Sequence, residues 1–252
     1  KMAAGDEFTG FRFDAAGSSS PTFGRLASQL QDALGMQYSQ ADGDCVITVR
    51  PTSKGWEVLC RVGNRPLGTR RWRVVDYHGS LNATLAAAMV ELAHPRPRDV
   101  FLNVMCGSGT LLIERLARCR VAAAIGIDRA DRALDAAVRN TGAAGFSRDI
   151  SLVRGDAQRL PLPEASVDTV CCDLPWGETH GSRDTNAKLY GQVFTEAHRV
   201  CRPGARMVVL TQDTQALKSI MAQTRRHWHL EDERTFVQRG FRPVCQVVRK
   251  TD

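Results

Sequence analysis

From residue 80 onward the chain alternates apolar strand-like runs with helix-like runs, and no other feature limits its fold as strongly. In chain order, the pattern predicts a helix over 81–94, a strand over 99–105, a helix over 110–119, a strand over 122–128, a helix over 130–142, strands over 149–156 and 166–173, a helix over 186–201, a strand over 206–211 and a helix over 214–223. The strands are nearly continuous apolar runs, which indicates burial on both faces. We therefore expect an α/β fold with a parallel sheet between two helix layers.

The two ends of the chain depart from this alternation. Strand-like residues 233–240 and 243–250 are separated by only a short turn, so they are expected to pair antiparallel. Near the N-terminus, residues 21–35 predict a helix that stops at Gly35, and residues 44–50 and 55–63 predict two strands. We therefore expect a small α+β unit over residues 1–75 and a larger α/β domain over residues 76–252.

Composition excludes several classes of protein. Apolar residues make up 43% of the 252-residue chain, yet no apolar stretch approaches the roughly 18–20 residues that a bilayer crossing requires. The N-terminal KMAAGDEFTG lacks the apolar centre of a signal peptide, so a cytoplasmic protein without membrane contact is expected. None of the eight cysteines is spaced C-x-x-C, which favours buried structural thiols over a metal site or disulfides.

Positive charge is concentrated in one segment. Residues 50–73 hold six arginines and one lysine against Glu57 alone, and they include Trp56 and Trp72. Arginine binds phosphate bidentately, and both arginine and indole stack on bases. This pattern favours a nucleic-acid contact, and a solvated basic face is the alternative.

A glycine-rich turn lies between the strand over 99–105 and the next helix. The turn, NVMCGSGT, spans residues 103–110, and glycine at 107 and 109 permits a tight bend and a close approach to a ligand. The spacing differs from G-x-G-x-x-G, so the dinucleotide motif is not met. A tight turn would by itself explain these glycines.

Two acids follow the next two strands of the predicted sheet. Asp128 comes about twenty residues after the glycine turn, where a carboxylate can accept the hydroxyls of a ribose. Asp156 closes the following strand and could accept a hydrogen bond from an adenine amine. For both residues, capping of a local turn or helix is the alternative.

The strand over 166–173 ends in DLPWG, residues 173–177. A tryptophan is an unusual choice for a surface turn, because it places a large apolar ring in water. A core tryptophan is the alternative to a functional one. A site that suits adenine and ribose but lacks the motif for binding a diphosphate suggests S-adenosylmethionine as the ligand.

Residues 81–211 resemble a class I methyltransferase, and DLPWG resembles the signature of the members that methylate amines. The arrangement RPLGTRRWR, HGSLNATLAAAMVELA, VMCGSGTLLIE, GID, GDA and DLPWG is similar to the THUMP-domain guanine methyltransferases that act on tRNA. The likeness extends more loosely over residues 8–75, which look like part of a THUMP domain.

The resemblance implies a Rossmann-like seven-stranded sheet, mostly parallel and with an antiparallel C-terminal hairpin, preceded by a partial THUMP-like unit. It implies S-adenosylmethionine as the cofactor and a guanosine amine in RNA, specifically tRNA, as the target. The residues it assigns to the cofactor are Asn103, Met105, Cys106, Gly107, Gly109, Thr110, Asp128, Asp156 and Ala157. Those assigned to the target base are Asp173, Leu174, Pro175 and Trp176, and those assigned to the RNA backbone are Arg65, Arg70, Arg71 and Arg73.

The chain departs from the family pattern in two ways. The family usually has Asp-Pro where this chain has Asn103-Val104, a change that would weaken cofactor binding. The family also carries a ferredoxin-like domain ahead of THUMP, which this sequence does not show. Either the chain is a fragment, with a further domain or a protein partner expected to complete the RNA contact, or it docks RNA differently.

The DLPWG residues suit amine methylation. Asp173 can accept one N–H of an exocyclic amine and the Leu174 carbonyl the other, which frees the nitrogen lone pair for in-line attack. Pro175 holds Leu174 extended, and Trp176 would stack on the purine. Tyr190 and His180 are candidates for lining the pocket, with helix-surface and loop positions as the alternative.

Methylation of adenine in DNA or RNA, methylation of a protein glutamine, and an RNA-binding subunit with weak catalysis stay open as alternatives.

Overall fold

The computed structural model describes residues 10–62, 68–176, 183–237 and 240–251. The chain divides into two compact units, Lys1–Leu67 and Gly68–Asp252.

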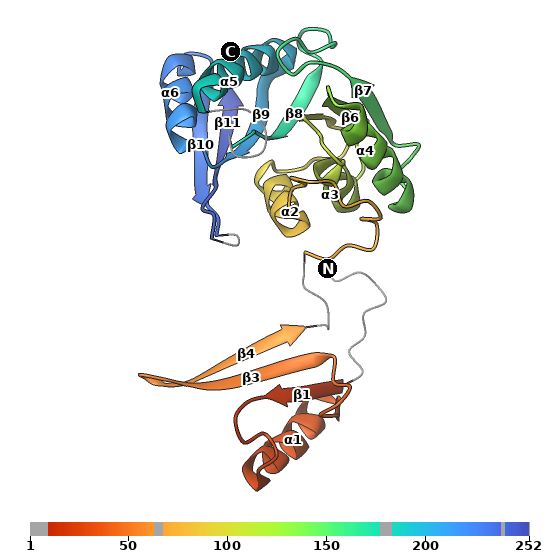
Figure 1. The fold of residues 1–252 in the computed structure, drawn as a ribbon, viewed down its shortest axis with the longest axis vertical. Helices are drawn as coiled ribbons and strands as arrows, with labels where there is room; N and C mark the ends of the chain where they lie inside the picture. Colours follow the sequence, from red (N-terminus) through yellow and green to blue (C-terminus); the bar gives the residue numbers. More distant parts are fainter. Residues whose placement is uncertain (1–9, 63–67, 177–182, 238–239, 252) are drawn as a thin grey trace. The chain divides into compact units, whose positions relative to one another are not determined.

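The second unit is built on a seven-stranded sheet (Figure 1). Its strands are β5 (Val100–Val104), β6 (Ala123–Asp128), β7 (Ile150–Arg154), β8 (Val167–Asp173), β9 (Cys201–Thr211), β10 (Trp228–Thr235) and β11 (Val244–Lys250). Across the sheet the order is β10-β11-β9-β8-β5-β6-β7, in which β11 is antiparallel to both of its neighbours, β10 and β9, and the remaining pairs are parallel. The predicted mostly parallel sheet and antiparallel C-terminal hairpin are confirmed.

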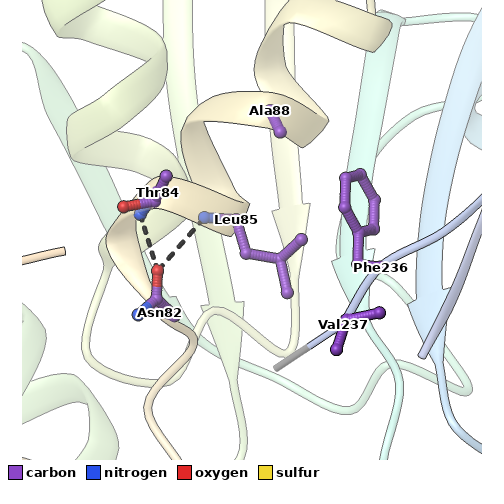
Figure 2. A pocket seen from close by; sticks show the side chains of 6 residues that line it. All are labelled: Asn82, Thr84, Leu85, Ala88, Phe236 and Val237. Atoms are coloured by element: carbon purple, nitrogen blue, oxygen red, sulfur yellow. Dashed lines mark hydrogen bonds between the residues drawn. The ribbon is translucent and has the colours of Figure 1, made fainter. Parts of the chain in front are cut away.

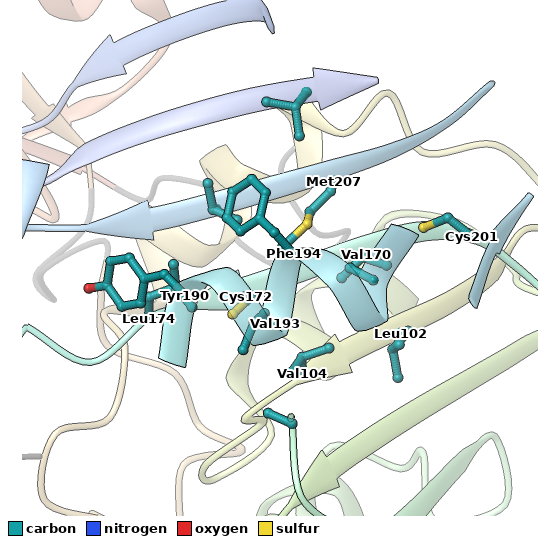
Figure 3. Close-up of a cluster of buried hydrophobic side chains, with 14 of the residues drawn as sticks. Leu102, Val104, Val170, Cys172, Leu174, Tyr190, Val193, Phe194, Cys201 and Met207 are labelled. Carbon is teal, nitrogen blue, oxygen red and sulfur yellow. The ribbon is translucent and has the colours of Figure 1, made fainter. Parts of the chain in front are cut away.

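Helices cover both faces of this sheet. The helices are α2 (Ala83–Leu92), α3 (Thr110–Arg118), α4 (Asp131–Ala143), α5 (Arg183–Val200) and α6 (Thr214–Thr224). Side chains of α2 and α3 form one apolar cluster with the sheet, and side chains of α5 and α6 form the other (Figure 3). This two-layer burial explains why the central strands are apolar along their whole length.

The C-terminal hairpin begins earlier than the pattern predicts. Strand β10 starts at Trp228, whose ring is 2% exposed and whose Nε1–H donates to the Phe194 carbonyl at 3.4 Å. The strand ends at Thr235, so Phe236, Val237 and Gly240 of the expected strand lie outside it, and residues 238–239 are not among the described residues. Val244 pairs with Thr211, which places the start of β11 beside the end of β9. The loop between β10 and β11 therefore lies at the edge of the sheet where β8 and β9 end.

The first unit is a four-stranded sheet with one helix. It comprises β1 (Gly10–Asp14), α1 (Pro21–Leu34), β2 (Gln37–Tyr38), β3 (Cys45–Thr52) and β4 (Gly55–Val62), in the sheet order β2-β1-β3-β4. A small apolar cluster centred on Phe11, Phe13 and Ala27 joins α1 to the sheet. Helix α1 ends at Gly35, which has a φ of 66°, as predicted.

Other features of the described residues bear on function class. Among them, no helix combines the length and apolar character needed to cross a membrane. No cluster of three or more His, Cys, Asp or Glu side chains in the described chain is arranged to hold a metal ion. All eight cysteines are free, and six of them are buried.

Candidate active site

The glycine turn connects β5 to α3 at the carboxyl edge of the sheet. Met105, Gly107 and Gly109 have positive φ values of 53°, 52° and 81°. Such a conformation is strained for Met105, and strained backbone is concentrated at functional sites. The Cys106 N–H donates to the Ile127 carbonyl at 3.0 Å, which joins the turn to β6. The hydrogen bond to β6 therefore fixes the conformation of this turn, which ends at the N-terminus of α3.

Asp128, at the end of β6, braces this turn. One carboxylate oxygen accepts the Gly107 N–H at 2.9 Å, and the other accepts the Ala130 N–H at 2.9 Å. The N-cap residue of α4 is Ala130, so Asp128 caps the turn into the helix without being its N-cap. Each oxygen keeps unused acceptor capacity, because a carboxylate offers about four lone-pair sites.

Asn103 is in β5, two residues before Met105 of the turn, and it is paired with Cys171 of β8. Its side chain is 1% exposed, and Nδ2 donates to the Cys171 carbonyl at 3.0 Å and to the Val104 carbonyl at 3.3 Å. Among the described groups, its Oδ1 has no hydrogen-bond partner. An aspartate could not donate these two bonds, so the asparagine fits its local surroundings.

Asp156 lies in a turn after β7. Its Oδ1 accepts from the Gln158 N–H at 2.9 Å and from Gln158 Nε2 at 3.3 Å, so the local turn interaction that the sequence left open is present. The residue is exposed, and the adjacent Ala157 is buried. The carboxylate therefore stays accessible to a ligand.

Asp173, at the end of β8, has a different environment from Asp128. Among the described residues, its side-chain hydrogen-bond partner is Trp176, whose Nε1–H donates to Oδ1 at 3.3 Å. Burial raises the pKa of Asp173 to about 7, and the weak Trp176 hydrogen bond offsets only part of that rise. Asp173 is partly exposed to solvent, so a ligand can reach it.

The backbone after Asp173 is anchored twice. The Leu174 N–H donates to the Leu210 carbonyl at 2.9 Å, and the Pro175 carbonyl accepts from the Tyr190 hydroxyl at 2.6 Å. Within the described chain, no donor is bonded to the Leu174 carbonyl. The segment thus presents two acceptors in sequence, the Asp173 carboxylate and the Leu174 carbonyl.

An apolar pocket of about 330 Å³ opens at the same edge (Figure 2). It is lined by the start of α2 and by the residues after β10, namely Asn82, Thr84, Leu85, Ala88, Phe236 and Val237. Trp176 packs against the same cluster as Leu85 and Phe236, and its ring lies 5.8 Å from that of Phe241. Trp176 and two of the pocket's lining residues, Leu85 and Phe236, therefore belong to one apolar cluster.

The arginines assigned to RNA differ in their surroundings. Arg70 donates to both carboxylate oxygens of Glu114, at 2.8 and 3.4 Å. Arg73 donates to the Leu81 carbonyl and to Thr110 Oγ1, and burial lowers its pKa. Both side chains thus hold the segment before α2 against α3. Arg71 is exposed, and Arg65 lies outside the described residues, as do Gly177 and His180.

Sequence reasoning missed one contributor to this site, Ser80, and left the place of another, Tyr190, open. Tyr190, expected on a helix surface or lining the pocket, is fully buried and bonded to the Pro175 carbonyl. Ser80 Oγ lies 2.8 Å from Ser108 Oγ, so the segment before α2 touches the glycine turn. The apolar i, i+3, i+4 positions around Tyr190 offered a signal of burial, whereas nothing local indicated the partner of its hydroxyl.

Comparison with known proteins agrees with this geometry. Residues 70–240 match UPF0020, described as the RMKL-like methyltransferase domain. The chain is 32% identical over 184 residues to tRNA (guanine(6)-N(2))-methyltransferase THUMP3 of Homo sapiens, covering 68% of this chain and 36% of that protein. It is 25% identical over 198 residues to tRNA (guanine(6)-N2)-methyltransferase of Methanocaldococcus jannaschii, covering 64% of this chain and 52% of that protein. The chain thus spans about a third to a half of these relatives.

The structure of TrmN from Thermus thermophilus is similar over most of the chain. The TM-score is 0.72 at 26% identity, covering 96% of this chain and 73% of that one.

Proposed function

Because the chain belongs to the UPF0020 family, whose RMKL-like methyltransferase domain spans residues 70–240, we propose that it methylates the exocyclic amine of a guanosine in RNA, with S-adenosylmethionine as the methyl donor. Transfer RNA is the proposed substrate class. The proposed catalytic domain is residues 68–252, and residues 1–67 form a THUMP-like unit that binds RNA, so the boundary lies eight residues before the one expected from the sequence.

One observation carries this proposal. Asp173 is partly exposed, its carboxylate and the Leu174 carbonyl are consecutive acceptors, and neither is bonded to a backbone donor among the described residues. A primary amine has two N–H groups, which these two acceptors can receive together. As the nitrogen becomes positive, the carboxylate stabilises it and can accept a proton, because its pKa of about 7 is close to neutral pH.

The residues at the ends of β5, β6 and β7 suit the methyl donor. Asp128 is held in place by the Gly107 and Ala130 N–H groups and keeps acceptor capacity for ribose hydroxyls. The positive φ of Gly107 and Gly109 keeps the turn open beside α3. The first N–H groups of this helix favour an anion, here the carboxylate of the methyl donor. Asp156 and Ala157 border the position for adenine. When bound, S-adenosylmethionine supplies an electrophilic methyl group on a positively charged sulfur.

Trp176 and the apolar pocket suit the target base. An indole stacks on a flipped base with a gain of about 1–3 kcal/mol. The pocket is lined by Leu85 and Phe236, which share an apolar cluster with Trp176, so it offers apolar surface to a base stacked on the indole. The names of the relatives, which specify guanine N2 in tRNA, support guanine over adenine or a protein glutamine.

The test is transfer of labelled methyl to unmodified total tRNA, followed by nucleoside analysis of the product. Wild type is compared with Asp173→Ala and, as a matched control, Asp135→Ala on α4. We expect N2-methylguanosine from wild type and from the control, and a loss of about 10²–10⁴-fold in Asp173→Ala.

Label on adenosine would move the assignment to adenine methylation. An absence of label with the cofactor bound would favour an RNA-binding subunit or the need for a further domain. Equal activity of Asp173→Ala and wild type would exclude Asp173 from the chemistry.

A further inference from the structure

A buried hydroxyl holds the backbone of the target-base segment, Asp173–Trp176. The Tyr190 side chain extends from α5 and is 0% exposed, among apolar neighbours that include Leu174 and Cys172 (Figure 3). Its hydroxyl lies 2.6 Å from the Pro175 carbonyl and 2.6 Å from Thr211 Oγ1. A phenylalanine would fill the same apolar space, so packing alone does not account for the hydroxyl.

The protons of this network can be assigned. A carbonyl only accepts, so the single Tyr190 O–H donates to Pro175. The Thr211 hydroxyl must then donate to the Tyr190 oxygen, while Thr211 Oγ1 accepts the Asp213 N–H at 3.0 Å. The bonds therefore run in one direction, from the end of β9 through Tyr190 to Pro175.

The network continues into the helix layer. Asp213 Oδ2 accepts from Asn186 Nδ2 at 3.0 Å, and Oδ1 accepts the Ala216 N–H at 3.1 Å as the N-cap of α6. Asn186 and Thr211 are both 0% exposed. The Pro175 carbonyl is thus connected through hydrogen bonds to β9 of the sheet and to the helices α5 and α6.

We propose that Tyr190 is a positioning residue, which acts through the Pro175 carbonyl to orient the Leu174 carbonyl and the Trp176 ring for methyl transfer. The proposal rests on the proposed function for the direction of its effect on catalysis. Pro175 has no N–H to donate, and among the described residues the backbone from Leu174 to Trp176 is anchored by the Tyr190 bond and the Leu174–Leu210 bond. The Tyr190 bond fixes the peptide that joins Pro175 to Trp176, and without it this peptide can rotate.

Hydrogen exchange tests the anchor independently of activity. In Tyr190→Phe, the amides of Leu174 and Trp176 should exchange at least several-fold faster than in wild type. Tyr38→Phe is the matched control, because it removes a hydroxyl bonded only to Gln40 in the first unit. Unchanged exchange in Tyr190→Phe would overturn the proposal whether or not the protein methylates RNA.

Steady-state kinetics with tRNA test the consequence. In Tyr190→Phe we expect kcat to fall about 10–100-fold, with the KM for tRNA and the Kd for S-adenosylmethionine within about twofold of wild type. Thr211→Val should lower kcat in the same direction, and Thr211→Ser should restore it. An unchanged kcat, or a fall in Tm and cofactor affinity without a change in kcat, would assign Tyr190 a structural role alone. Absence of methyl transfer by wild type would instead contradict the proposed function.

Discussion

Two aspartates end two strands of the same sheet, and their surroundings give them opposite properties. Asp128, after β6, accepts two backbone N–H groups, each at 2.9 Å. Asp173, after β8, accepts one longer bond from an indole, and burial raises its pKa to about 7. A carboxylate with two backbone donors is held in one orientation, whereas a carboxylate with few donors is left to bind and deprotonate a ligand. Residue type and strand position are the same, so the donors around each acid decide its role.

Removal of Asp128 should have the largest effect on cofactor binding. Asp128→Ala leaves the Gly107 N–H without its acceptor and removes the proposed ribose contact, so S-adenosylmethionine should bind about 10–100-fold more weakly. Asp173→Ala should bind it within about twofold of wild type. Titration calorimetry measures both values.

Asp131→Ala is the control, because Asp131 lies three residues further on and its ion pair with Arg154 is exposed. Cofactor affinity equal to that of wild type in Asp128→Ala would show that the two acids do not differ as proposed.

The pH dependence of activity should follow Asp173. Its carboxylate form is needed to accept the amine, and its pKa is raised to about 7, so the single-turnover rate should rise about tenfold between pH 6 and pH 8. A rate that is flat over this range would exclude Asp173 as the titrating acceptor.

The free energy of unfolding should fall as pH rises, whereas the rate of methyl transfer should increase. The folded protein holds the Asp173 proton up to about pH 7, whereas the unfolded chain releases it near pH 4, so this contribution to folding is lost as pH rises between these values. The side chain in Asp173→Asn cannot ionise. The Tm of this variant minus the Tm of wild type should therefore be larger at pH 8 than at pH 4. Thermal unfolding of both proteins across pH measures this difference.

The smallest expected effect concerns the indole N–H. The Trp176 hydrogen bond lowers the pKa of Asp173, so Trp176→Phe should raise the midpoint of the pH–rate profile by less than about one unit. The ring stays available for stacking, and the rate at pH 9 should remain near that of wild type. Trp56→Phe, at an exposed site in β4, is the control. A midpoint that moves down would contradict the assigned hydrogen bond.

Much of the fold followed from local pattern. The apolar strands and the periodic helices depend on the spacing of residues that are close in the sequence. The glycines at 35, 107 and 109 likewise meet a local need for a positive φ. The start of β10 did not follow, because Trp228 belongs to the strand through its contact with Phe194 on α5. The arginine-rich segment was read as a surface, yet Arg70 and Arg73 bind Glu114 and Thr110 on α3. Such partners are distant in sequence and leave no local signal.

From its sequence alone, this chain specifies an alternating α/β sheet and the acids and glycines that follow its strands, because periodicity and turn chemistry depend on neighbouring residues. Only the tertiary structure decides which Asp173 or Asp128 oxygen meets which donor, and that a hydroxyl on α5 holds the Pro175 carbonyl. The physical reason is that hydrogen bonding and desolvation act over a few ångströms of space, whatever the separation along the chain.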